Sequence, residues 1–204
     1  MARVGRDTRR DMVISAVEVL RERGADAVTL DAVLTRSGAP RGSIYPHFPG
    51  GRREILSDAL HFAGDAIAAL IERVAEAGAT PALREFSAFW KKILRDSNYT
   101  AGCPVVSVAV SNADHDGAQL AEQAGDIFDR WCSAMRMALV CDGLTASSAD
   151  RVATMVVASV EGAVVLCRVR RSTAPLDEVV RGLELLIDIE KFLARNDFEK
   201  KDRP

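Results

Sequence analysis

The chain of 204 residues is long enough for one or two domains with an apolar core, since 48% of it is hydrophobic and 27% is charged. Its longest stretch without a charge, 97–113, contains Gly102 and Pro104 and falls short of the roughly 20 mainly apolar residues that span a membrane. Because the N-terminus also lacks the pattern of a signal peptide, we expect a cytoplasmic protein without a membrane segment.

The charge is distributed unevenly, although the total is only −2. Residues 1–56 contain ten arginines against seven acidic residues, whereas acidic residues are in excess over the rest of the chain. A basic segment on an acidic body indicates an anionic partner for that segment alone.

The first predicted elements are three helices close together. An amphipathic pattern predicts a helix over 8–23, and Thr29 is a candidate N-cap for a short second helix. Gly38 suits a left-handed turn after it. A third helix begins at Pro40 and should stop near Pro46, because a proline disfavours the helical conformation of its predecessor. Two short helices joined by a glycine-bearing turn are typical of a helix-turn-helix.

The remaining chain predicts further helices and no strand. Apolar residues recur at helical spacing over 52–77, 81–94, 120–141, 146–169 and 176–195. The β-branched run 105–111 finds no partner strand, so we expect a short buried helix after Pro104. The sequence therefore predicts an all-α fold of about nine helices.

No set of residues for catalysis, for a metal or for a cofactor is recognisable. The chain has no G-x-S-x-G motif and no glycine-rich phosphate loop after a strand, which argues against an enzyme. The four cysteines form no C-x-x-C pair and no cluster with histidine. We interpret them as small buried residues, with a redox-sensing pair as the alternative. They are Cys103, Cys132, Cys141 and Cys167.

The segment 29–56, TLDAVLTRSGAPRGSIYPHFPGGRREIL, resembles the DNA-binding segment of the tetracycline-repressor (TetR) family of bacterial regulators. The resemblance rests on a Thr-capped helix, a Gly turn, a short recognition helix, a His-Phe pair and a basic residue opening the next helix. Pro-Gly-Gly before Arg52 and the run Gly102-Cys103-Pro104-Val105 are similar to an LmrA-like subgroup. The resemblance implies a helix-turn-helix domain over 1–51 and an effector-binding and dimerisation domain over 52–204.

The chemistry of this segment suits DNA recognition. Gly42 and Ser43 are small enough to let the backbone approach bases, and Arg41 can donate two hydrogen bonds to guanine. The resemblance implies phosphate contacts from Thr29, Tyr45, His47 and Arg52. The alternative is that Tyr45 packs in the core and that His47 caps the next helix. The expected DNA-contacting set is Thr29, Arg41, Gly42, Ser43, Tyr45, His47 and Arg52.

Large apolar side chains recur on helical stripes of the second domain that we expect to converge. Core packing explains such stripes, and the resemblance adds a pocket for a small, largely apolar effector. The expected effector-binding residues are Phe62, Phe86, Phe89, Trp90, Phe128, Trp131, Met135, Met155 and Ser159.

The last two long helices are too apolar for the surface of a monomer, and in the resembled family such helices pair across a two-fold axis. The expected interface residues are Val156, Val160, Val164, Val180, Leu183 and Ile187. We therefore predict a homodimeric repressor that an effector releases from a pseudo-palindromic operator in double-stranded DNA. A cysteine-switched regulator, and an activator or architectural DNA-binding protein without a ligand, stay open as alternatives.

Overall fold

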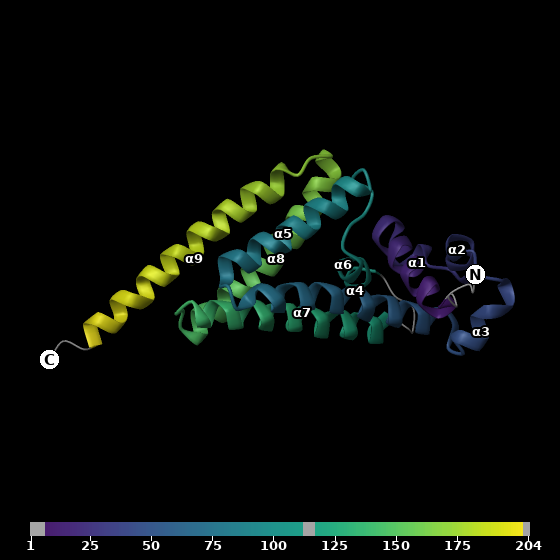
Figure 1. Cartoon of the computed structure of the whole chain (residues 1–204), viewed down its shortest axis with the longest axis horizontal. Coiled ribbons are helices and arrows are strands. Elements are labelled where there is room, and N and C mark those ends of the chain that lie inside the picture. Colours follow the sequence, from purple (N-terminus) through teal and green to yellow (C-terminus); the bar gives the residue numbers. More distant parts are fainter. Residues whose placement is uncertain (1–6, 112–116, 202–204) are drawn as a thin grey trace, which may run out of the picture. The chain divides into compact units, whose positions relative to one another are not determined.

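The computed structural model describes residues 7–111 and 117–201, and all regular elements in those ranges are helical (Figure 1). The predicted all-α fold is confirmed, as is the short helix after Pro104. The elements within these ranges are α1 Thr8–Arg23, η1 Ala25–Ala27, α2 Leu30–Ser37, η2 Arg41–Ser43, α3 Ile44–His47, α4 Gly51–Ala75, α5 Ala79–Asp96, α6 Pro104–Ala109, α7 Gly117–Cys141, α8 Ala146–Arg170 and α9 Ala174–Lys201.

Two compact units make up the chain, and α4 and α7 contribute to both. The head unit comprises Met1–Asp65 and Thr100–Ile127, and the body unit comprises Ala66–Tyr99 and Phe128–Pro204. This division differs from the expected boundary between residues 51 and 52. The reason is that α6 packs against α1 and η1, so a segment distant in sequence belongs to the head unit.

The head unit is held together by an apolar core and by a backbone hydrogen bond between two segments that are distant in sequence. Met12, Leu20 and Phe48 are at most 1% exposed, and burying each such side chain stabilises the fold by roughly 1.5–3 kcal/mol. The N–H of Gly102 donates to the carbonyl oxygen of Arg21 at 2.8 Å. This bond fixes the segment before α6 to the last turn of α1.

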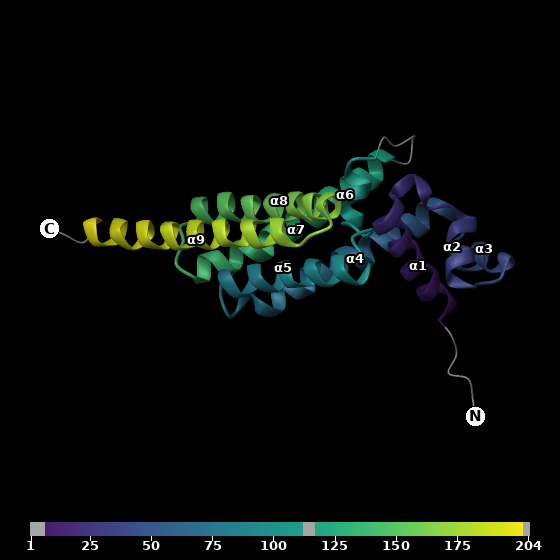
Figure 2. The ribbon, with the colours of Figure 1, turned by 90° about the horizontal axis from the view of Figure 1, so that it is seen from above.

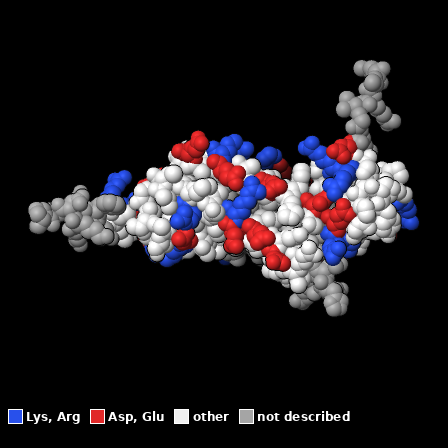
Figure 3. Space-filling model, turned by 90° about the horizontal axis from the view of Figure 1, so that it is seen from below, with Lys and Arg blue, Asp and Glu red and all other residues white. Residues whose placement is uncertain are grey.

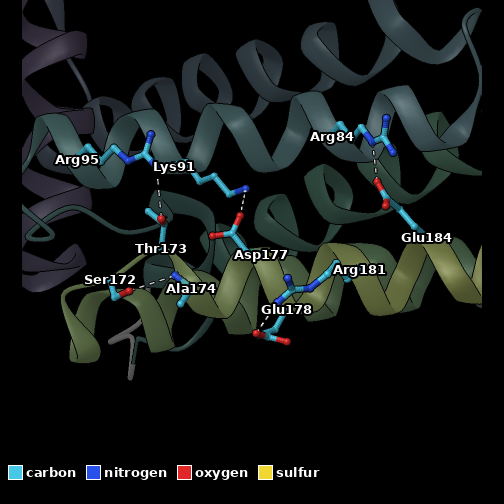
Figure 4. A network of polar contacts seen from close by, with 10 residues as sticks. All are labelled: Arg84, Lys91, Arg95, Ser172, Thr173, Ala174, Asp177, Glu178, Arg181 and Glu184. Carbon is cyan, nitrogen blue, oxygen red and sulfur yellow. Dashed lines mark hydrogen bonds and ion pairs between the residues drawn. The ribbon is translucent and has the colours of Figure 1, made fainter.

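In the body unit, α8 and α9 run antiparallel side by side, and α5 lies along both (Figures 1 and 2). Ion pairs fix the register of α5 against α9: Arg84 lies 2.6 Å from Glu184, and Lys91 lies 2.6 Å from Asp177 (Figure 4). Each pair has one exposed and one half-buried partner, so these pairs select the register more than they stabilise the fold.

Helix α8 is the one helix in the described ranges that is long and apolar enough to cross a membrane. Half of its most apolar window is buried inside the protein, as in a core helix. The longest uncharged stretch of the sequence did not identify α8, because Arg151 and Glu161 interrupt the apolar run of this helix. On the face in Figure 3, basic and acidic side chains are interspersed.

Candidate functional site

Helix α2 begins and ends as the sequence predicts. The Thr29 hydroxyl accepts a hydrogen bond from the N–H of Ala32 at 3.1 Å and caps the helix. Gly38 ends it with φ 66° and ψ 21°, a left-handed conformation that strains residues with a side chain. This turn leads into η2 and α3, residues 41–47, which we call the recognition segment.

The recognition segment exposes polar side chains above buried apolar ones. The side chain of Arg41 is 88% exposed and lies 3.5 Å from the carboxylate of Asp31 on α2. Tyr45 is 66% exposed, so it does not pack in the core, whereas Ile44 and Phe48 anchor the segment from below. A Cβ added to Gly42 would meet nothing within 4 Å, so a bound molecule can approach the protein backbone closely at this residue.

The other polar groups of this segment make local contacts. The Ser43 hydroxyl donates to the carbonyl oxygen of Pro40, and His47 is half-buried. The third helix ends close to Pro46, as predicted, but includes it: α3 covers Ile44–His47. Pro46 is only the third residue of α3, where a backbone N–H needs no partner within the helix, so its missing donor is tolerated.

Arg9 of α1 ties the end of the recognition segment to α4. Its guanidinium donates to the carbonyl oxygen of His47 at 3.3 Å and lies 4.7 Å from the ring centroid of Phe48. The same group lies 3.3 Å from the Glu54 carboxylate and 2.6 Å from that of Asp58. The first two turns of α4 and the recognition segment are therefore linked through one side chain.

Arg52 has a structural role that the resemblance did not imply. Its Nε donates to the carbonyl oxygen of Val28 at 2.7 Å, and its Nη2 donates to that of Ala25 at 2.8 Å. Ala25 is the first residue of η1 and Val28 directly follows this short helix, so Arg52 bridges its two ends. Two nitrogens of Arg52 therefore hold α4 to the turn between α1 and α2, and the expected phosphate contact stays a prediction.

Arg36 fixes α2 against α1. It donates to Glu18 at 2.6 Å and to both carboxylate oxygens of Glu22 at 2.8 Å. The hydrogen bonds that Arg36 donates to Glu22 and Glu18 raise the pKa of Arg36, and the bond from Arg36 lowers the pKa of Glu22. Such a two-point contact between a planar guanidinium and a carboxylate also sets the angle between the helices.

Five of the expected effector residues form an aromatic cluster in the body unit. The ring centroids lie 6.5 Å apart for Phe86 and Trp90, 6.1 Å for Phe86 and Trp131, 5.2 Å for Phe89 and Trp90, and 5.4 Å for Phe128 and Trp131. The middle three rings are fully buried, whereas Phe89 and Phe128 at the two ends are half-buried.

The other four expected effector residues differ from one another. Met135 is fully buried in the body unit, and Ser159 is half-buried. Met155 is 43% exposed and Phe62 is 40% exposed, and Phe62 belongs to the head unit. Neither Phe62 nor Met155 is therefore part of the buried aromatic cluster, and Phe62 instead lines a surface pocket of the head unit with Arg10 and His61. Both lie off the inward stripe of their helices, on sides whose apolar character the sequence could not distinguish from a core face.

Sequence reasoning missed two polar residues that are buried in the body unit. Ser87 is 2% exposed and Glu161 is 6% exposed. Ser87 continues the helical spacing of Leu83, Trp90 and Leu94, so a polar residue within this stripe was the signal that could have identified it. Glu161 follows Val160 on an edge of the buried face of α8 and had no comparable signal.

Most of the residues expected at the dimer interface lie on the inward faces of α8 and α9. The structure buries five of the six residues within the chain and leaves one half-buried. The buried five are Val156, Val160, Val164, Leu183 and Ile187, and the half-buried one is Val180. Because both helices are apolar around most of their circumference, the sequence could not show which side faces outward. The exposed apolar residues, which we call the outer stripe, are Met155, Val165, Leu166 and Val169 on α8 and Leu185, Ile189, Phe192 and Leu193 on α9.

The four cysteines form no disulfide within the described part of the chain, and their settings differ. Cys103 and Cys167 are buried, Cys132 is half-buried and Cys141 is exposed. Burial raises the pKa of Cys167 and of Cys132. A raised pKa lowers the fraction of thiolate, which is the form that reacts with oxidants. These two residues therefore have the opposite setting to a redox-sensing cysteine.

Two family models match consecutive segments of the chain. Residues 15–59 match the model of bacterial regulatory proteins of the tetR family. Residues 79–182 match the model of the C-terminal domain of LmrA/YxaF-like transcriptional regulators. The first segment contains the recognition segment, and the second contains the aromatic cluster, all of α8 and the beginning of α9.

Relatives and solved structures agree with these models. An uncharacterized HTH-type transcriptional regulator of Mycobacterium tuberculosis is 37% identical over 183 residues, which cover 88% of this chain and 93% of that protein. The HTH-type transcriptional regulator LmrA of Bacillus subtilis is 28% identical, with 83% of this chain and 91% of that protein covered. The crystal structure of a TetR transcriptional regulator from Legionella pneumophila has the same fold, with a TM-score of 0.77, 18% identity, and coverage of 90% of this chain and 99% of that one.

Proposed function

Because the chain belongs to the TetR family of bacterial transcriptional regulators, in its LmrA/YxaF-like group, we propose that it is a cytoplasmic repressor released from its operator by a small molecule. Members of this family bind DNA and dimerise, and they are not enzymes. The observation that carries the proposal is the recognition segment, whose exposed Arg41, Gly42 and Tyr45 stand on the buried anchors Ile44 and Phe48.

In the proposed complex, the recognition segments of two chains enter successive major grooves of a pseudo-palindromic operator. This geometry requires half-sites about 34–36 Å apart or a multiple of that distance. Arg41 reads a base edge through its exposed guanidinium, while Thr29, Tyr45 and His47 contact phosphates and fix the orientation. Arg52 acts indirectly, by holding α4 to the turn that precedes α2.

The homodimer forms, in this proposal, through the outer stripe on α8 and α9. Val169 is 78% exposed and Phe192 is 65% exposed, and both continue a helical row of exposed apolar side chains. A contiguous apolar surface of this kind marks a site of association in a water-soluble protein. A two-fold axis through it would pair the same stripe on both chains.

Release of the operator follows from binding of an effector at the aromatic cluster. Helix α4 is one continuous helix of 25 residues that contributes to both units, and Arg9 and Arg52 tie its beginning to the DNA-binding elements. A ligand that alters the course of α4 in the body unit would therefore shift the recognition segment. Moving such an equilibrium from 1:99 to 99:1 requires about 5.5 kcal/mol of differential binding.

Selection of bound duplexes from a random DNA library tests the proposed function. We expect a consensus with two inverted half-sites, because a two-fold protein reads the same sequence twice. A consensus without inverted symmetry, or no enrichment at low salt, would contradict the proposal.

A further inference from the structure

An exposed ion pair joins α2 to the recognition segment. One oxygen of the Asp31 carboxylate lies 3.5 Å from Nη2 of Arg41, and the two side chains are 76% and 88% exposed. Ion pairs this exposed contribute little to folding stability, because water screens them and both side chains lose freedom. The first turn of a helix favours an acid at any of its positions, which does not account for an acid beside Arg41. The fold therefore gains little from this pair, and its effect falls on what Arg41 binds.

Asp31 is the rigidly held partner of the pair. Helix α2 is fixed against α1, because Arg36 donates to Glu18 and to both carboxylate oxygens of Glu22. Asp31 is the second residue of this fixed helix. Arg41, in contrast, carries its guanidinium on a long side chain with several rotatable bonds. A carboxylate on the fixed helix therefore restricts where this guanidinium lies.

The ion pair leaves Arg41 able to read a base. A guanidinium has five N–H donors in one plane, so a contact between Nη2 and Asp31 leaves enough donors for the O6 and N7 atoms of a guanine. Restricting a flexible side chain before binding reduces the entropy that it loses on binding. Arg41 beside Asp31 should therefore discriminate guanine from the other bases more strongly than Arg41 alone.

The negative charge of Asp31 has a second effect on DNA binding. Phosphates attract basic side chains whatever the base sequence, and an exposed carboxylate near the contact weakens this attraction. The repulsion lowers the affinity for every duplex, whereas the positioning of Arg41 raises the affinity only for a duplex with the right guanine. Together the two effects increase the ratio of operator affinity to random-DNA affinity.

We propose that Asp31 is a positioning residue for operator recognition, which holds the guanidinium of Arg41 toward one guanine in each half-site and so raises the preference for that guanine. This inference rests on the proposed function, because it specifies how the recognition segment selects its operator. Asp31 itself contacts no base, and the base that depends on it is the one that Arg41 reads.

A double-mutant cycle on the full-length protein tests the inference. The probes are the duplex selected from the random library and duplexes in which one base pair is changed in both half-sites, measured by fluorescence anisotropy at one salt concentration. Arg41→Ala identifies the guanine that Arg41 reads, as the position where the base preference is lost. Asp31→Ala should lower the preference for the same guanine by about threefold to tenfold. In the Arg41→Ala background, Asp31→Ala should have no further effect, because the side chain on which it acts is gone.

The control removes an acid from another part of the head unit. Asp26 is exposed in η1, so Asp26→Ala changes the charge equally and should leave every base preference unchanged. Affinity for a random duplex distinguishes positioning from misfolding: it should not fall in Asp31→Ala, whereas a misfolded protein would bind both duplexes more weakly. If the alanine variant is less stable in urea, Asp31→Asn keeps the size of the side chain, removes its charge and repeats the test.

Four results would overturn the inference: a base other than guanine at the position read by Arg41, an unchanged preference in Asp31→Ala, an equal loss in both backgrounds, or a loss at a different base. The proposed function is tested separately, by the symmetry of the selected consensus. If the half-sites are inverted but Asp31→Ala changes no preference, the proposed function stands and this inference fails. If the two substitutions are coupled at one guanine of an asymmetric consensus, positioning by Asp31 stands and the dimeric repressor fails. If no duplex is enriched, both fail.

Discussion

Replacing Arg52 with lysine or methionine separates a structural role from a phosphate contact. Lysine keeps the positive charge but has a single ammonium group, which cannot reproduce the planar arrangement of two guanidinium donors. If Arg52 bound phosphate, lysine would preserve both DNA affinity and stability. Because its Nε and Nη2 instead donate to the carbonyls of Val28 and Ala25, we expect both variants to lose stability.

The magnitude follows from these two bonds, which are 2.7 Å and 2.8 Å long and partly buried. A hydrogen bond to a charged group contributes about 1.5–3 kcal/mol, and partial exposure favours the lower end. Arg52→Met should therefore reduce the free energy of unfolding by about 2–4 kcal/mol, and Arg52→Lys by about half as much. With a denaturant dependence near 2 kcal/mol per molar of urea, the midpoint for Arg52→Met falls by roughly 1–2 M.

Urea unfolding followed by circular dichroism measures this loss, and fluorescence anisotropy at several salt concentrations measures DNA binding. Arg23→Met is the control, because Arg23 is an exposed arginine at the end of α1. The salt dependence of DNA affinity should be the same in Arg52→Met as in the wild type. Unchanged stability together with a salt slope smaller by about one unit would refute the structural role, since that is the signature of a lost phosphate contact.

Three further predictions concern other surfaces. Arg41→Ala should cost about 1–3 kcal/mol at a single base position, measured by anisotropy on operators varied one base at a time; undisturbed binding would mean that the recognition segment is wrongly assigned. Changing both Val169 and Phe192 to Glu should convert the dimer to a monomer in sedimentation velocity, and a persistent dimer would contradict the outer stripe as interface. Since Arg36 lowers the pKa of Glu22 below its ordinary value of 4.5, ionised Glu22 favours folding above that pH, and this contribution is lost as the pH falls through the folded-state pKa. Glu22→Gln should therefore lose stability less steeply than the wild type between about pH 5 and pH 3, and an equally steep loss would contradict this.

The features that the sequence predicted correctly depend on local chemistry. Thr29 caps α2 through its own hydroxyl, and Gly38 ends the same helix in a conformation that glycine adopts freely. Both the cap and the helix end depend only on residues that are close in sequence. Helical periodicity likewise identified the aromatic stripe of Phe86 and Trp90, because the repeat of the helix determines which side chains share a face.

The features that it missed depend on contacts between distant segments. Arg52 meets carbonyls 24 and 27 positions away, and nothing in its local sequence distinguishes that environment from an open phosphate site. The same applies to α8, where Val160 and Val169 are equally apolar although one is buried and the other is 78% exposed. Which side of such a helix faces inward is decided by packing against α5 and α9, and the helix's own pattern does not contain that information.

The stoichiometry of the complex with a selected duplex tests most directly whether paired recognition segments read DNA. Sedimentation equilibrium should give two chains on each full operator, and a duplex with only one half-site should bind about 100-fold more weakly or worse, because the second contact becomes intramolecular in the full site. One chain per full operator, or equal affinity for the half-site, would contradict recognition by a dimer.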